Sequence, residues 1–160
     1  MCLELREEVE LELARLNALV KSFRPLLTKT KEAVPDTIET VALAGFLHSL
    51  YTGIENIFKR IALHAEKKLP EGPAWHSRLL EEMAEANTNR PPVISHELRD
   101  TLSDYLSFRH VFRHAYSFEL KWKKMAPLVS QCENTCEQLQ VELNRFFERL
   151  GMDDYEEPDS

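Results

Sequence analysis

The sequence predicts an all-α protein, folded as an antiparallel bundle of four to five helices. Apolar residues recur at steps of three and four over long stretches, which is the spacing of one face of a helix. The 160 residues include only four glycines, which favours long helices over many strands, and no alternating strand pattern stands out. We therefore expect one helical domain over residues 1–150, followed by a disordered acidic tail over 151–160.

The first part of the sequence predicts two long helices. Pro25 should bend the first helix or end it near Arg24, because proline removes a hydrogen-bond donor and crowds the preceding turn. After a break, Asp36 or Thr37 can cap a second helix over about 37–68. The apolar face of the first helix consists of Val9, Leu13, Leu16, Val20, Phe23 and Leu27.

The second helix is apolar enough to be the central element of the bundle, and a polar stripe runs beside its apolar face. The stripe consists of His48, Thr52, Glu55 and Lys59 at helical spacing. Two interpretations are open. Either the stripe is a solvated edge with an internal pair between Glu55 and Lys59, or Glu55 supports the basic residues of a motif in the second half of the chain.

Two further helices are predicted in the middle of the chain. A short one covers about residues 74–86 and precedes a loop over 87–92, where two prolines stop any helix. Ser95, with Glu97 and Leu98 behind it, then opens a helix that leads directly into the motif.

The last helix is predicted to begin around Glu119 and to end at Gly151. Cys132 and Cys136 lie four residues apart on one of its faces, which favours packing in the core over redox chemistry. Together with Cys2 they form no zinc-ligand pattern and no even-numbered disulfide framework.

The composition is that of an ordinary soluble protein, with 43% hydrophobic and 29% charged residues. No run of about 20 apolar residues and no signal-peptide pattern is present, so we expect a cytoplasmic protein with no membrane partner. The net charge of −7 argues against a general nucleic-acid binder, yet residues 109–124 carry five basic residues and one acidic residue. A basic island on an acidic chain predicts a local anion-binding site.

The most informative segment is 109–116, which holds two arginines, two histidines and a tyrosine in eight residues. Arginine offers a fixed charge and a flat donor fork that suits phosphate, and histidine titrates near neutral pH. These are the components of a metal-free ribonuclease. On an unbroken helix His114 points about 140 degrees away from Arg109. The two residues can share one phosphate only if the helix breaks around Arg113 or if a second protomer supplies its own copy.

Arg109, His114 and Tyr116 follow the spacing arginine, four residues, histidine, one residue, tyrosine. This pattern resembles the HepT-like toxins of the HEPN superfamily, small all-helical ribonucleases paired with a nucleotidyltransferase antitoxin of the MNT type. Two upstream segments, 47–57 and 90–95, are also similar to one branch of that family. The resemblance implies a HEPN-type bundle and a homodimer whose arginines and histidines line a shared cleft.

The resemblance also implies a role for each residue of the motif. His114 would deprotonate a ribose 2'-hydroxyl, whose oxygen attacks the adjacent phosphodiester and leaves a 2',3'-cyclic phosphate. Arg109 would hold the phosphate and stabilise its developing charge, without a metal or other cofactor. Tyr116 is similar to the tyrosine that the partner nucleotidyltransferase can adenylylate, and the added AMP would block RNA by charge and volume. The auxiliary candidates are His110, Arg113 and Glu55.

Two functions from different classes stay open. The first is an endoribonuclease toxin of a type II/VII-like toxin-antitoxin pair, which the presence of both Arg109 and His114 favours. The second is a non-catalytic HEPN helical module that binds RNA, a nucleotide or a partner protein through the same basic cleft. His110 and His114 could instead ligate a metal, but no third ligand lies close in sequence. No role is evident for His64, His76 and His96.

Overall fold

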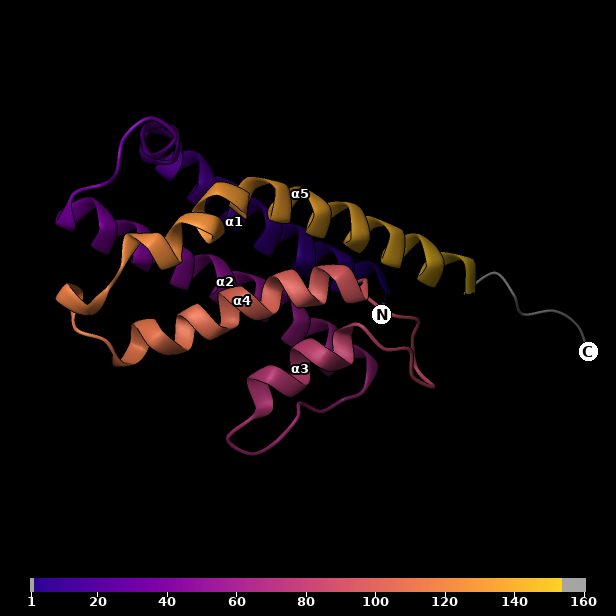
Figure 1. Ribbon diagram of the computed structural model, residues 1–160. Helices are drawn as coiled ribbons and strands as arrows, with labels where there is room; N and C mark the ends of the chain where they lie inside the picture. Colours follow the sequence, from indigo (N-terminus) through magenta and orange to yellow (C-terminus); the bar gives the residue numbers. More distant parts are fainter. Residues whose placement is uncertain (1, 154–160) are drawn as a thin grey trace, which may run out of the picture.

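The computed structural model describes residues 2–153, and its five α-helices pack together into one bundle. In Figure 1, α1, α2, α4 and α5 run alternately in opposite directions, and the short α3 lies outside them against α2 and α4. The predicted antiparallel helical bundle is therefore confirmed. The elements are α1 (Cys2–Thr30), α2 (Thr37–Ala65), α3 (Trp75–Met83), α4 (His96–His114), the 3-10 turn η1 (Ser117–Glu119) and α5 (Trp122–Asp153).

The helix α2 is the central element, as its composition predicts, because it contacts each of the other four α-helices. Most of its apolar residues are buried, and the exposed ones, Ile38, Val41 and Leu63, lie towards its two ends. No helix within residues 2–153 is long and apolar enough to cross a membrane. The apolar residues of α2 that are less than 2% exposed are Leu43, Ala44, Phe46, Leu47, Leu50, Tyr51, Ile54, Ile57, Phe58 and Ile61.

Side-chain caps fix where α2 and α4 begin. The Asp36 carboxylate accepts a hydrogen bond from the backbone N–H of Glu39 at 2.8 Å, and the Glu39 carboxylate accepts one from the Asp36 N–H at 3.1 Å. This reciprocal capping box satisfies two N–H groups that the helix itself leaves unpaired. The Ser95 hydroxyl accepts a hydrogen bond from the Leu98 N–H at 3.1 Å. Asp36 and Ser95 are thus the caps that the sequence predicts.

Pro25 and Gly151, where the sequence predicts a bend or an end, both lie inside helices. α1 continues through Pro25, and Figure 1 shows its last turns nearly end-on, so the helix bends there and does not end. Buried Leu27 keeps these turns against the core and offsets the lost hydrogen bond. The predicted end of α5 at Gly151 is wrong, because the helix continues to Asp153 and glycine costs a helix only about 1 kcal/mol. The rest of the predicted tail, 154–160, lies outside the described residues.

The two cysteines of α5 are core residues, as their spacing predicts. Cys132 is buried and Cys136 is partly buried against the core. Burial raises the pKa of the Cys132 thiol to about 11 and that of the Cys136 thiol to about 12. Both therefore stay protonated, and poorly reactive, near neutral pH.

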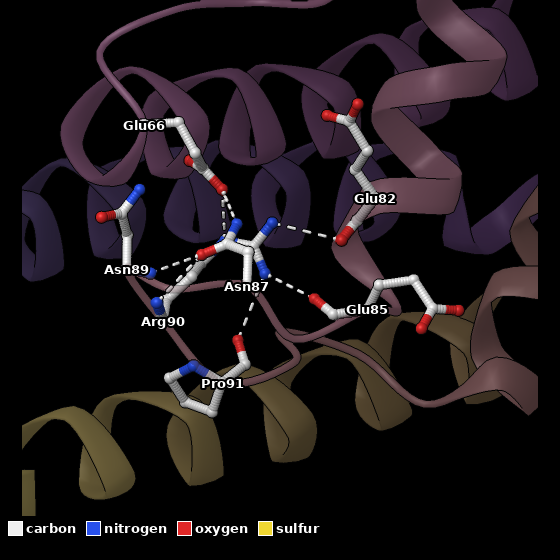
Figure 2. Close-up of polar contacts among 7 residues, drawn as sticks. All are labelled: Glu66, Glu82, Glu85, Asn87, Asn89, Arg90 and Pro91. Carbon is white, nitrogen blue, oxygen red and sulfur yellow. Dashed lines mark hydrogen bonds and ion pairs between the residues drawn. The ribbon is translucent and has the colours of Figure 1, made fainter.

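The loop between α3 and α4 is fixed by Arg90, whose side chain is only 1% exposed (Figure 2). Its Nε donates a hydrogen bond to the Glu66 carboxylate, just beyond the end of α2, at 2.8 Å. Its two terminal nitrogens donate to the backbone carbonyls of Glu82, Glu85 and Pro91 at 2.9 to 3.2 Å. One guanidinium thus ties the end of α2, the end of α3 and the following loop together, and thereby fixes the position of α3.

We expect Arg90→Met to lower the free energy of unfolding by roughly 3–5 kcal/mol, because it leaves Glu66 and three carbonyls without their buried partner. Urea unfolding followed by circular dichroism measures the change. The control is Arg99→Ala, which removes an exposed pair with Asp100 at 3.0 Å and should cost less than about 1 kcal/mol. Similar small changes in both variants would contradict a structural role for Arg90.

Candidate functional site

Arg109, the first residue of the motif, lies inside the bundle. Its guanidinium donates two hydrogen bonds to the carboxylate of Glu55 on α2, at 3.2 Å to Oε1 and 3.0 Å to Oε2. Both side chains are only 5% exposed, and the guanidinium carbon lies 5.0 Å from the centre of the Tyr51 ring. A two-pronged pair of this kind is strong where water is excluded. The charge of Arg109 is thus compensated within the chain.

The polar stripe on α2 is not the solvated edge that one interpretation predicts. Glu55 pairs with Arg109 of the motif and forms no ion pair with Lys59. The Lys59 ammonium lies 5.1 Å over the ring of Trp75 on α3. The other interpretation, in which Glu55 supports the motif, agrees with these contacts.

His76, on α3, contacts both Glu55 and Arg109, and these three side chains form what we call the buried cluster. Its Nδ1 lies 2.7 Å from Oε2 of Glu55 and 2.8 Å from a terminal nitrogen of Arg109, and its ring stacks on Trp75 with centres 3.7 Å apart. Nδ1 cannot donate to the carboxylate and also accept from the guanidinium. We assign the proton to Nδ1, because an unprotonated nitrogen at 2.7 Å would repel the carboxylate. His76 therefore donates to Glu55, which leaves Nε2 as the other reactive nitrogen of the ring.

A surface pocket of about 450 Å³ opens between the start of α3 and α4, next to this cluster. Four side chains of its wall can carry positive charge, and serine hydroxyls add hydrogen-bond donors. Since no acidic residue lies in the wall, the pocket is suited to an anion such as a phosphodiester. The polar wall includes His76, Ser77, Ser107, Arg109, His110 and Arg113.

His114 lies apart from this pocket. Of the two alternatives for joining His114 to Arg109, the helix break around Arg113 does not occur. The helix α4 continues through His114, and the chain leaves it only at Ala115, where φ is −97° and ψ is 141°. His114 is exposed, and its ring packs edge-on against that of His110 with centres 4.9 Å apart. Within the described part of one chain it forms no hydrogen bond with Arg109. One chain alone does not bring together the two residues predicted to be catalytic.

Tyr116 lies just beyond α4 and is 71% exposed. Its ring stacks parallel to that of Phe118, itself 80% exposed, with centres 5.7 Å apart. Its backbone N–H donates to the Glu119 carboxylate at 3.3 Å. The phenol is therefore accessible to another protein and takes no part in the buried cluster.

His48 lies in α2 beside the motif. Its ring centre is 5.2 Å from that of Phe112, and its Nδ1 is buried without a hydrogen-bond partner. Burial, together with the charges of Arg109 and Arg113, lowers the pKa of His48, so the ring stays neutral near neutral pH. His48 is therefore a packing residue beneath the motif and adds no charge to it.

His76 is the member of the cluster that the sequence does not reveal. It lies 21 residues from Glu55 and 33 residues from Arg109, and no local spacing relates these positions. Only the packing of α3 across α2 and α4 brings it to the site. Of the other two histidines without a predicted role, His64 contacts Glu8 at 3.2 Å and His96 is exposed beside Glu85.

The metal-binding alternative for His110 and His114 lacks a further ligand. Within residues 2–153, no group of three or more histidine, cysteine, aspartate or glutamate side chains is arranged to hold a metal ion. The chemistry that the arrangement itself offers is anion binding by guanidinium and imidazole groups, with imidazole nitrogens available for proton transfer.

Comparison with known proteins gives one match. Residues 42–150 fit the family model described as HepT-like protein, which covers more than half of the chain and includes the buried cluster, the pocket and the whole motif. No curated protein and no solved structure matches the chain.

The buried pair should make Arg109 important for stability as well as for any chemistry. We expect Arg109→Ala to lower the free energy of unfolding by roughly 3–5 kcal/mol, because Glu55 then stays buried without a compensating charge. The double variant Glu55→Gln, Arg109→Met should recover most of the stability that Arg109→Ala loses, because it buries no unpaired charge. Urea unfolding tests both, with exposed Arg113→Ala on the same helix as a control that should change stability by less than about 0.5 kcal/mol. Equal stability of all variants would contradict the pair's structural role.

Proposed function

The chain belongs to the HepT-like protein family, whose fold is a HEPN helical bundle, and on that premise we propose that it is an endoribonuclease toxin. It would cleave RNA by attack of a ribose 2'-hydroxyl on the adjacent phosphodiester, without a metal ion, as one half of a toxin-antitoxin pair in the cytoplasm. The observation that carries the proposal is the basic pocket beside α4, lined by Arg109, His110 and Arg113 within a region that matches the family.

The proposed reaction assigns a separate task to each group. The scissile phosphate binds in the pocket, where exposed Arg113 and His110 contact its oxygens and Arg109 stabilises the charge that builds on them. His114 accepts the proton of the 2'-hydroxyl as that oxygen bonds to phosphorus. The bond from phosphorus to the 5'-oxygen breaks, and the products are a 2',3'-cyclic phosphate and a 5'-hydroxyl.

A homodimer resolves the separation of Arg109 and His114 within one chain. His114 is exposed at the end of α4, so a two-fold axis near that end can bring the His114 of one protomer to the pocket of the other. Val111 and Phe118, which precede and follow His114 in the sequence, are exposed and supply apolar surface for the contact. The exposed, charged end of α4 thereby becomes part of a composite site.

The proposed regulation acts on Tyr116. A nucleotidyltransferase antitoxin of the MNT type would remove the phenolic proton and join the oxygen to the α-phosphate of ATP, with pyrophosphate as the leaving group. The 71% exposure of Tyr116 supports this role, since the modifying enzyme must reach the ring. The AMP would then stand two residues from His114 and exclude RNA from the composite site.

The second candidate is a non-catalytic module that binds RNA, a nucleotide or a protein. The pairing of Arg109 with Glu55 favours it, because a compensated guanidinium contributes less charge to a bound phosphate than a free one. Retention of binding without cleavage separates this function from the first.

We expect His114→Ala to lower the rate of RNA cleavage at least about 100-fold while leaving the helical circular dichroism unchanged, because the exposed imidazole serves proton transfer and not packing. The assay measures cleavage of RNA oligonucleotides in EDTA and identifies the cyclic phosphate by mass. Matched 2'-deoxy oligonucleotides should stay intact, and His96→Ala, in an exposed histidine away from the pocket, should cleave like the wild type. Binding of RNA without cleavage by the wild type would leave only the binding module.

Tyr116→Phe should keep most ribonuclease activity yet escape neutralisation by the nucleotidyltransferase and ATP. A phenol with a reference pKa of about 10 is a poor general base near neutral pH, but it accepts a nucleotidyl group once a partner enzyme deprotonates it. Intact-mass measurement after incubation counts the AMP units that each protein gains. Equal gains in the wild type and in Tyr116→Phe would place the modification at another residue.

A further inference from the structure

Cleavage of RNA by its own 2'-hydroxyl requires two proton transfers. A base removes the proton of the attacking hydroxyl, and an acid supplies a proton to the leaving 5'-oxygen, which is otherwise expelled as a strongly basic alkoxide. The motif 109–116 assigns only the first task, to His114. The second task needs a proton donor that faces the same phosphate.

His76 is placed to be that donor. Its Nδ1 is held by the Glu55 carboxylate at 2.7 Å, and its ring is fixed by stacking on Trp75 at 3.7 Å. The side chain remains 28% exposed and forms part of the pocket wall together with Arg109, His110 and Arg113. An imidazole whose Nδ1–H is bound to a carboxylate is fixed in orientation and presents Nε2 for proton transfer.

No other histidine outside the motif combines these features. His64 also contacts a carboxylate, that of Glu8 at 3.2 Å, but it is not part of the pocket wall. His96 is exposed elsewhere, and His48 is a neutral packing residue. Among the histidines of the described residues, only His76 has a carboxylate partner, a place in the pocket and a contact with Arg109.

We propose that His76 is a second proton-transfer residue of this site, a role that rests on the proposed ribonuclease function. Protonated His76 gives its Nε2 proton to the 5'-oxygen as the bond from phosphorus to that oxygen breaks. His114 holds the proton from the 2'-hydroxyl, so each cycle moves one proton onto the protein and one off it. Exchange with water restores both rings. Glu55 is a positioning residue, which orients His76 and balances its charge.

The charged groups around His76 come from both neighbouring helices. Glu55 of α2 brings a negative charge within 2.7 Å of Nδ1, and Arg109 of α4 brings a positive charge within 2.8 Å of it. Arg113 and His110 also line the pocket, and no acidic residue lies in its wall. A bound phosphate therefore adds a negative charge beside His76 at the step in which a proton is given to the 5'-oxygen.

The test compares two RNA substrates, one with the natural 5'-oxygen and one with sulfur at that bridging position, whose thiolate leaves without a proton. The variant is His76→Asn, since asparagine can keep an N–H donor toward Glu55 and removes Nε2. Its rate of cleavage should fall about 100-fold or more on the oxygen substrate and stay close to that of the wild type on the sulfur substrate. His114→Ala should cleave both substrates more slowly. The matched control is His64→Asn, in a histidine that is also paired with a carboxylate, and it should cleave both substrates like the wild type.

A second measurement needs no variant. With the wild type, the rate on the oxygen substrate should fall at high pH as the acid loses its proton, and the sulfur substrate should lack that fall. Three results would each overturn the role of His76 while leaving the chain a ribonuclease. They are the same pH profile on both substrates, a wild-type cleavage rate in His76→Asn, and an equal loss of rate on both substrates in that variant. No cleavage of either substrate by the wild type would overturn the proposed function and this role with it.

Discussion

The ion pair between Glu55 and Arg109 is the interaction on which the arrangement of the site depends. A charge buried to this extent is tolerated only if its partner meets it with good geometry, so α2 and α4 can pack in only one register at this level. The same carboxylate accepts the hydrogen bond from His76 and thereby determines where α3 approaches. Three helices from different parts of the chain are aligned by one side chain of the central helix.

The pair also separates Arg109, the one buried residue of the motif 109–116, from the partly buried and exposed residues that follow it. Arg109 faces the interior, whereas His110, Arg113 and His114 face solvent along the last turns of the same helix. A continuous helix imposes this division, since it distributes successive residues around its axis. A stable fold and an accessible basic surface therefore arise from adjacent positions of one short segment.

Much of the fold can be predicted from local signals in the sequence, but the site can be predicted only in part. Aspartate and serine are effective N-caps in most proteins, so Asp36 and Ser95 can be recognised as helix starts from the sequence. The high density of arginine and histidine in 109–116 can also be seen in the sequence alone. The continuation of α5 past Gly151 cannot be predicted from the sequence, because glycine weakens a helix by only about 1 kcal/mol and does not always end it. The place of His76 in the site is harder still to predict, because it depends on contacts with Glu55 and Arg109, which lie on two helices distant in sequence.

The helix α3 is anchored at both ends by contacts that do not involve the chain leading into it. Near its start His76 is bound to Glu55, and at its end Arg90 binds the carbonyls of Glu82 and Glu85. The preceding residues 71–74 are exposed, so this connection can change in length between related proteins while the helix stays in place. The loop that contains Arg90 has no such freedom. Natural variation in length should therefore accumulate before α3 and be nearly absent after it.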